Sequence, residues 1–216
     1  MLSEYSLIIM GVSAIRGRRR ATEERRREIL AAAGRVFARK GFERSTTAEI
    51  AREAGVAEGT IFRYFPTKRD LLVSVVASLV MESLPALLER IETGTIEDAI
   101  KDILRNRLDL IKENAPLLKL FFAEALFRED LREKFIEEVV LRATARAEAF
   151  YRQQQEQGNL RPLNPQIAIR CLMGMLGIFV IWKEFLGGDR YVRFDEEEVL
   201  ETITTIYLDG VRNRGR

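Results

Sequence analysis

The chain has 216 residues, of which 47% are hydrophobic, so it can bury a core as one domain of ordinary size or as a small domain fused to a larger one. Its net charge is only +2, but residues 1–70 carry +6 and residues 71–216 carry −4, so a charge-driven partner must be met by the first third. The chain has no histidine and one cysteine, Cys171, which excludes Ser-His-Asp and Cys-His catalysis, histidine-bound metals and an internal disulfide. We therefore expect a protein without a metal or cofactor, in a reducing, cytoplasmic compartment.

Residues 1–15 are expected to form a flexible extension, and their apolar stretch is too short to span a bilayer. The first helix is predicted from Glu23 to Lys40, because its apolar residues recur at steps of three and four residues and Gly41 can end it. Its basic residues 25–27 lie among glutamates and are expected to pair within the helix.

Two short helices are predicted next. Residues 46–49, Thr-Thr-Ala-Glu, form a capping-box pattern that starts a helix, and Gly55 offers the left-handed conformation that ends it after about two turns. A second helix runs through Ala57–Tyr64, with Ile61 and Phe65 facing back toward the first. Two short helices at a steep angle are the geometry of a helix-turn-helix.

The outward side chains of the second short helix decide between a DNA-binding unit and a helix-turn-helix corner that never meets nucleic acid. They suit close approach to a duplex, hydrogen bonding to phosphate and reading of base edges, and they are Gly59, Thr60, Phe62, Arg63 and Tyr64. After Pro66, Thr67 is expected to cap the next helix together with Asp70. Lys68 lies in the first turn of that helix, where the helix dipole disfavours a cation unless an anion lies nearby. A DNA phosphate would supply that anion.

Residues 46–56 and 59–72 resemble the tetracycline-repressor (TetR/AcrR) family of bacterial transcription regulators. The resemblance implies a three-helix DNA-binding domain, residues 16–70, and an all-α ligand-binding and dimerisation domain, residues 71–216, which dimerises through its last two long helices. It also implies that the second short helix enters the major groove. Phosphate contacts are implied for Thr46, Thr60, Tyr64 and Lys68.

Three residues depart from the family pattern. Ala57 stands where many members carry a capping Ser or Thr, and Phe62, where Tyr is usual, is expected to touch a thymine methyl. Glu58 would repel phosphate, so it either faces a cytosine amino group or is turned away. With Thr47, these residues complete the predicted DNA-contact set. The basic run Arg16 to Arg20 is either an arm that reaches the DNA or a solvated tail.

The remaining chain also has helical periodicity, so we predict an all-α fold of about nine helices. Breaks at glycine, proline and asparagine separate the later helices, which are predicted at Lys68–Ile91, Ile96–Glu113, Pro116–Phe127, Glu129–Gln157, Pro165–Gly187 and Asp195–Arg214. Pro85 is expected to bend the first of them.

The helix predicted at Pro165–Gly187 is hydrophobic nearly all round, so a second apolar surface is needed beside the subunit's own core. A copy of the same helix across a twofold axis is the expected partner, and the alternative is a fully intramolecular core. A membrane span is disfavoured because charged residues bracket the run. The expected homodimer interface comprises Phe179, Trp182, Ile203, Ile206, Tyr207 and Gly210.

A ligand pocket in the second domain is expected from aromatic, thioether and aliphatic side chains, although each of them also suits an ordinary core. The expected lining is Leu104, Arg107, Leu108, Ile111, Phe121, Phe122, Met173, Gly177 and Ile178. If one of Arg105, Arg107 and Asp109 points inward from the 96–113 helix it would supply a polar anchor, and the alternative is a solvated face. Cys171 is expected to be a buried apolar thiol, with oxidant sensing as the alternative.

These features together predict a homodimeric repressor that a small hydrophobic effector releases from a pseudo-palindromic double-stranded DNA operator. Its two DNA-binding domains would enter successive major grooves about 34–36 Å apart. A DNA-binding protein that works without a ligand, or under the control of a protein partner, is the alternative. An enzyme is not expected, because the sequence shows no catalytic constellation.

Overall fold

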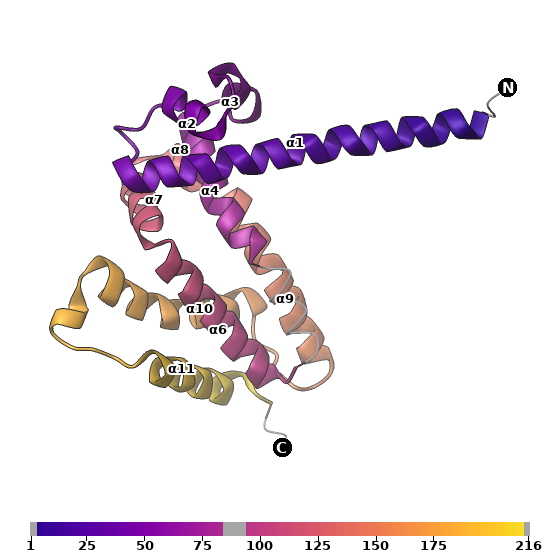
Figure 1. The fold of residues 1–216 in the computed structure, drawn as a ribbon. Coiled ribbons are helices and arrows are strands. Elements are labelled where there is room, and N and C mark those ends of the chain that lie inside the picture. Colours follow the sequence, from indigo (N-terminus) through magenta and orange to yellow (C-terminus); the bar gives the residue numbers. More distant parts are fainter. Residues whose placement is uncertain (1–3, 84–93, 214–216) are drawn as a thin grey trace. The chain divides into compact units, whose positions relative to one another are not determined.

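A computed structural model of the chain describes residues 4–83 and 94–213 (Figure 1). These residues form helices and connecting turns, with one isolated β-bridge between Leu160 and Arg212 and no strand among them, so the all-α prediction is confirmed. The chain divides into two compact units, the head at residues 1–75 and the body at residues 76–216. The division falls inside a helix, after Val75.

The head contains α1 (Glu4–Lys40), α2 (Thr47–Ala54), α3 (Glu58–Tyr64) and the first half of α4 (Lys68–Glu82). The predicted start of the first helix at Glu23 is wrong, because α1 begins at Glu4. The basic run Arg16 to Arg20 therefore lies within a helix, and whether it reaches DNA stays a prediction. Arginine and alanine favour helix strongly, and single glycines at positions 11 and 17 cost too little to end it.

One apolar face of each helix builds the core of the head. The predicted stripe of α1 is buried, and α2 contributes two small or branched residues. Each large aliphatic or aromatic side chain buried in this way stabilises the head by about 1.5–3 kcal/mol. The almost fully buried side chains include Ile29, Val36, Phe37, Ile50, Ile61, Phe65, Leu71 and Leu72.

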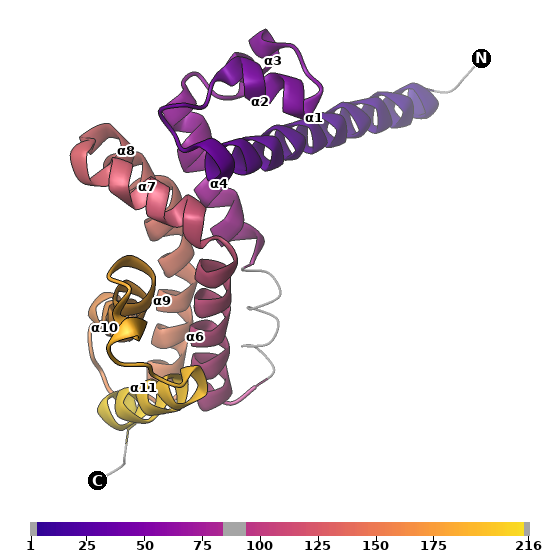
Figure 2. The same cartoon turned by 60° about the vertical axis from the view of Figure 1, so that its left-hand side comes forward.

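The body is built from helices of 7 to 18 residues, and Figure 2 shows them from a second direction. They are α6 (Ile96–Glu113), α7 (Ala115–Phe127), α8 (Glu129–Phe135), α9 (Leu141–Glu156), α10 (Pro165–Val180) and α11 (Glu196–Val211). The bounds of α6 are those predicted. The predicted helix at 129–157 is interrupted by a π turn, Ile136–Val140, and α10 continues into a second π turn, Ile181–Phe185. The predicted helix at 68–91 is observed to Glu82, and Pro85 lies outside the described residues.

The core of the body forms where α10 packs against α6, α9 and α11. Ile100 and Leu104 of α6 meet Leu172 and Leu176 of α10 in one buried cluster, which residues of α11 complete. Ion pairs at its edge link α11 to its neighbours, with Arg105 2.6 Å from Glu197. An exposed pair of this kind stabilises by at most about 1 kcal/mol, so apolar packing holds the body together.

Candidate DNA interface and effector cavity

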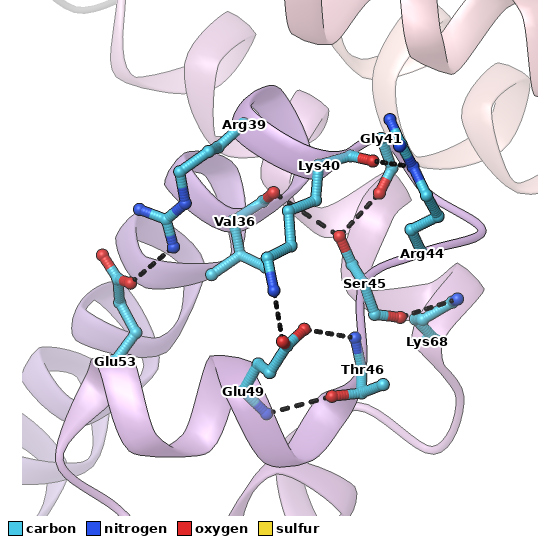
Figure 3. A network of polar contacts seen from close by, with 10 residues as sticks. All are labelled: Val36, Arg39, Lys40, Gly41, Arg44, Ser45, Thr46, Glu49, Glu53 and Lys68. Atoms are coloured by element: carbon cyan, nitrogen blue, oxygen red, sulfur yellow. Dashed lines mark hydrogen bonds and ion pairs between the residues drawn. The ribbon is translucent and has the colours of Figure 1, made fainter.

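The start of α2 is fixed by the predicted capping box (Figure 3). The Thr46 hydroxyl accepts a hydrogen bond from the Glu49 N–H, and the Glu49 carboxylate accepts one from the Thr46 N–H, both at 3.2 Å. Lys40 donates to the same carboxylate, and this hydrogen bond is the main reason that the pKa of Glu49 lies below its ordinary value. Gly55, at φ 65°, ends the helix in the predicted left-handed conformation.

A second polar network orients α2 against α1. Arg35 and Arg39 of α1 both donate to the Glu53 carboxylate, at 2.9 and 3.0 Å, and the Arg39 bond is drawn in Figure 3. The two hydrogen bonds, first that from Arg35, lower the pKa of Glu53. Residues 25–27 form the basic cluster nearer the middle of α1, and there Arg25 pairs with Glu28 at 2.8 Å, as predicted. Much of the positive charge of α1 is therefore used inside the head.

Lys68 holds the loop between α1 and α2. Its ammonium donates to the carbonyl oxygens of Phe42, at 2.8 Å, and Ser45, at 3.0 Å, and it lies 4.3 Å from the centroid of the Phe42 ring. The buried Ser45 hydroxyl donates in turn to the Gly41 carbonyl at 2.6 Å (Figure 3). An ammonium has three N–H donors. The sequence did not reveal that two of them serve the head itself.

The start of α4 is capped as predicted. The Thr67 hydroxyl accepts a hydrogen bond from the Asp70 N–H at 3.1 Å, and the Asp70 carboxylate accepts one from the Thr67 N–H at 3.0 Å. This reciprocal pair fixes the turn that joins α3 to α4, and with it the place of Lys68.

The outer face of α3 carries the side chains predicted to read DNA. Ile61 and Phe65 are almost fully buried, as expected, while Gly59 and Arg63 are exposed and Thr60 and Tyr64 are half-buried. Phe62 is 47% exposed, which is unusual for an aromatic side chain without a partner surface. The outer face is therefore mixed aromatic, hydroxyl and cationic.

Two residues at the start of α3 depart from the family pattern, and the structure places both. Ala57 occupies the N-cap position and makes no side-chain capping bond. The Glu58 carboxylate accepts a hydrogen bond from the Thr47 hydroxyl across the turn. In this structure Glu58 therefore lies against α2, and the Thr47 hydroxyl is engaged within the head.

The body contains a cavity of about 900 Å³, lined by side chains of α6, α7, α8, α9 and α10. Six of the predicted pocket residues line it, namely Arg107, Ile111, Phe121, Phe122, Met173 and Gly177. The other three do not. Leu104 is fully buried in the core, Leu108 borders a separate small pocket, and Ile178 is 59% exposed.

Sequence reasoning missed most of the contribution of the segment from α8 through the first π turn to α9 to this cavity. Its lining residues recur at steps of three and four, which is the signal that could have identified them, and they include Ile136, Val139, Val140, Ala143 and Ala147. Ile136, Val139 and Val140 belong to the first π turn, and Ile181 and Phe185 of the second π turn also line the cavity. Such turns often occur at functional sites.

The hydrogen-bond partners of Arg105 and Arg107 show which of these two arginines of α6 points inward. Arg105 bonds Glu197 of α11 at the surface, at 2.7 and 2.6 Å. Arg107 lines the cavity and donates to the Ser83 hydroxyl, at 2.8 Å, and to the Asn106 side-chain oxygen, at 2.7 Å. Burial lowers the pKa of its guanidinium.

The predicted dimer interface is corrected at two residues. Ile203 and Tyr207 are 3% and 4% exposed and belong to the core of their own chain, so they offer almost no surface to a second one. α11 is amphipathic, and these two positions are on its inner face, while Ile206 and Gly210 are exposed. Phe179 and Trp182 are half-buried. Phe179 packs on Phe194, with ring centroids 5.4 Å apart, and the Trp182 N–H donates to the Val192 carbonyl.

An exposed stripe runs along α10. Ile167, Cys171, Gly174 and Ile178, at steps of four, three and four residues, are all exposed, so the expectation of a buried Cys171 is wrong. Among the described residues, the segment Pro165–Phe185 is the one long and apolar enough to cross a membrane by length and composition. That property is weak support for a span, because core helices of soluble proteins share it.

A helix-turn-helix head and an all-α body with an apolar cavity define a DNA-binding transcription regulator. The family model described as "Bacterial regulatory proteins, tetR family" matches residues 29–75, and that described as "AefR-like transcriptional repressor, C-terminal domain" matches residues 98–209. The chain belongs to the tetR family of bacterial regulatory proteins.

Individual relatives agree with this assignment. The uncharacterized HTH-type transcriptional regulator YvkB of Bacillus subtilis is 28% identical over 189 residues, which cover 86% of this chain and 96% of that one. The nucleoid occlusion factor SlmA of Haemophilus influenzae is 34% identical over 116 residues, 52% of each chain. The chain spans about half the length of the SlmA proteins that it matches.

Solved structures share the fold. A TetR-family regulator from Mesorhizobium loti has a TM-score of 0.72 at 22% identity, over 88% of this chain and 98% of that one. FadR from Bacillus subtilis, solved in complex with stearoyl-CoA, has a TM-score of 0.66 at 22% identity, over 85% and 97%.

Proposed function

We propose that the protein is a homodimeric repressor that leaves a pseudo-palindromic operator when a small, mostly apolar ligand fills the cavity of the body. The observation that carries the proposal is a cavity of about 900 Å³ in the same chain as a helix-turn-helix head. That volume is in the range of small-molecule sites, about 300–1,000 Å³. Such a protein would act in the cytoplasm, and no catalytic step is part of the proposal.

The outer face of α3 is the proposed reading surface. In the major groove, Arg63 and Phe62 would meet base edges, while Ala57 and Gly59 would let the backbone approach the duplex closely. The Gly59 position is open, because a Cβ built there has no atom within 4 Å. Phosphate contacts are proposed for Thr46, Thr60, Tyr64 and the remaining N–H of Lys68. Thr47 and Glu58 would bind DNA only if their mutual hydrogen bond opened.

The dimer is proposed to form through the exposed stripe of α10 and the outer face of α11. Ile178 is 59% exposed and Ile206 is 56% exposed, and burial of such side chains favours association. Gly174 and Gly210 have open space beyond their Cα atoms, which permits close approach of a second pair of helices. A twofold axis here would place the same surface on both subunits.

α4 is the proposed link between ligand and DNA. It begins at Lys68, beside the proposed phosphate contacts, and its Val80 lines the cavity. A ligand that fits the cavity better in one position of α4 than in another shifts the population of that position, by its differential affinity for the two states. Release follows if the favoured position misplaces the two reading helices relative to each other.

Footprinting and gel-shift titration on the DNA upstream of the gene test the DNA part. Arg63→Ala should reduce the preference for operator over scrambled duplex by about 5- to 150-fold, corresponding to about 1–3 kcal/mol for a base-specific contact. Arg142→Ala removes an exposed arginine of α9 and is the matched control. An unchanged preference in the Arg63 variant would contradict the proposed reading surface.

Sedimentation tests the dimer. Ile178→Glu should produce monomers and weaken operator binding. Leu186→Glu, which changes an exposed leucine outside the stripe, should do neither. A wild-type protein that stays monomeric at micromolar concentration would defeat the proposal. If an added ligand tightened operator binding, the protein would be a corepressor-dependent regulator, and if no apolar molecule bound, the ligand-independent alternative would be favoured.

A further inference from the structure

The described lining of the cavity is almost entirely apolar, and the charged residues within it are all of one sign. Among the described lining residues, the charged side chains are Arg107, Arg132 and Arg146, and no Asp or Glu accompanies them. Arg132 donates to the carbonyls of Ala125 and Leu126, at 3.0 and 3.2 Å, and both Arg132 and Arg146 are exposed. The cavity therefore presents positive charge to whatever fills it.

Arg107 is the member of this set that is withdrawn from water. A guanidinium has five N–H donors, and both bonds of Arg107 come from one terminal nitrogen, Nη2. Its acceptors, the Ser83 hydroxyl and the Asn106 amide oxygen, are neutral, and Nη1 and Nε make no hydrogen bond to any residue in the described ranges. No carboxylate of those ranges forms an ion pair with Arg107.

A partly buried cation without a counter-ion is costly, because burial removes hydration that only a paired anion can replace. The lowered pKa of the Arg107 guanidinium has burial as its cause. Arg105 shows the contrast two residues earlier in α6, since it points outward and bonds both oxygens of Glu197. A ligand that carried an anionic group would supply a counter-ion, and this would explain why an arginine without an ion pair in the described ranges lines the cavity.

We infer that the effector is an anionic amphiphile whose apolar chain fills the cavity and whose acidic head group binds the guanidinium of Arg107. This inference rests on the proposed function and names its ligand class. The free N–H groups of Nε and Nη1 lie on different edges of the guanidinium, so each can donate a charge-assisted hydrogen bond to a carboxylate or phosphate oxygen, and a paired contact forms if the anion displaces one of the two neutral acceptors of Nη2. Arg132 and Arg146 would add to the positive field at the cavity without providing a buried site.

The test measures displacement of the neutral dye N-phenyl-1-naphthylamine from the full-length protein by three probes with the same alkyl chain. These are 1-dodecanol, dodecanoate and dodecyl phosphate, and the last two distinguish a carboxylate from a phosphate head group. We expect wild type to bind at least one of the anions about tenfold or more tightly than the alcohol, because hydrogen bonds from the Arg107 guanidinium to an anion are charge-assisted at both ends. Arg107→Gln should bind the anion and the alcohol equally, with unchanged affinity for the alcohol.

Arg105→Gln is the matched control, because it removes an arginine of the same helix that does not line the cavity, and it should keep the preference of wild type. Arg107→Lys should keep part of the preference, because it retains the charge and loses the fixed donors of the planar guanidinium. Thermal melts establish that the variants fold. Arg107→Gln without ligand should melt at the wild-type temperature or above it, and the anion should no longer raise its melting temperature.

Equal binding of the alcohol and both anions by wild type would overturn the inference and leave the proposed function standing, provided that the alcohol also releases DNA. A preference that persists in Arg107→Gln would overturn the assignment to this residue. If none of the three probes displaced the dye, the inference and the ligand-dependent part of the proposed function would both fail.

Discussion

Replacement of Lys68 by alanine should destabilise the head before any effect on DNA is considered. The ammonium makes two charge-assisted hydrogen bonds to backbone carbonyls and lies over the Phe42 ring. Bonds to charged groups contribute about 1.5–3 kcal/mol each, and an exposed cation–π contact adds about 0.5–1 kcal/mol. The low ends of these ranges together amount to about 3.5 kcal/mol. Because Lys68 is only half-buried, water can replace part of these interactions in the folded protein, and we expect a loss of about 2–3 kcal/mol in the free energy of unfolding.

Urea unfolding of the full chain, followed by circular dichroism, measures the total, and hydrogen exchange of the α2 amides assigns the loss to the head. Lys68→Met keeps most of the apolar stem and should lose nearly as much stability, since the polar bonds dominate. A change below about 0.5 kcal/mol for both variants would refute this account of Lys68. A contact between Lys68 and a DNA phosphate would be a separate effect. If Lys68 makes that contact, its replacement should lower the salt dependence of operator binding by the equivalent of about one phosphate contact, for all DNA sequences alike.

Three further outcomes follow from individual contacts. The lowered pKa of Glu53 means that its ion pairs stabilise the head above the ordinary carboxyl pKa of 4.5 and lose that effect as the pH falls through the folded value, so Glu53→Gln should flatten the acid limb of the head's pH–stability curve. Gly188→Ala should cost about 1–3 kcal/mol in urea unfolding, because a Cβ there would lie 2.1 Å from the Trp182 ring; an unchanged midpoint would show that the ring moves away freely. The buried hydroxyls of Tyr151 and Tyr207 have no hydrogen-bond partner within residues 4–83 and 94–213, so Tyr207→Phe should leave stability unchanged or raise it, and a loss above about 1 kcal/mol would reveal a partner.

Local sequence signals predicted the head well because its structure is set by neighbouring residues. The capping boxes at Thr46 and Thr67 and the left-handed Gly55 each depend on residues within a few positions. The internal role of Lys68 was not predictable in this way, because its acceptors lie 23 and 26 residues earlier in the chain. The start of α1 was missed because no local breaker marks it.

The body was less accessible to sequence reasoning, because hydrophobic periodicity identifies an apolar face without saying what covers it. Ile203 and Tyr207 have the spacing of an interface, yet that face packs on the chain's own core. Ile178 was assigned to the pocket and Cys171 to the interior, and both are exposed on α10. The two π turns also shift the register of the apolar residues that follow them, which a regular period cannot anticipate.

The π turns in the walls of the cavity have a consequence for how its shape can evolve. A π turn accommodates one residue more than an α turn, and one residue corresponds to a rotation of about 100° around a helix. Loss of a single residue within 136–140 or 181–185 could therefore restore a regular helix and change which side chains face the cavity over a whole turn. Insertions and deletions at these two places, and not only substitutions, give such a regulator a route to new effectors while α2 and α3 stay unchanged.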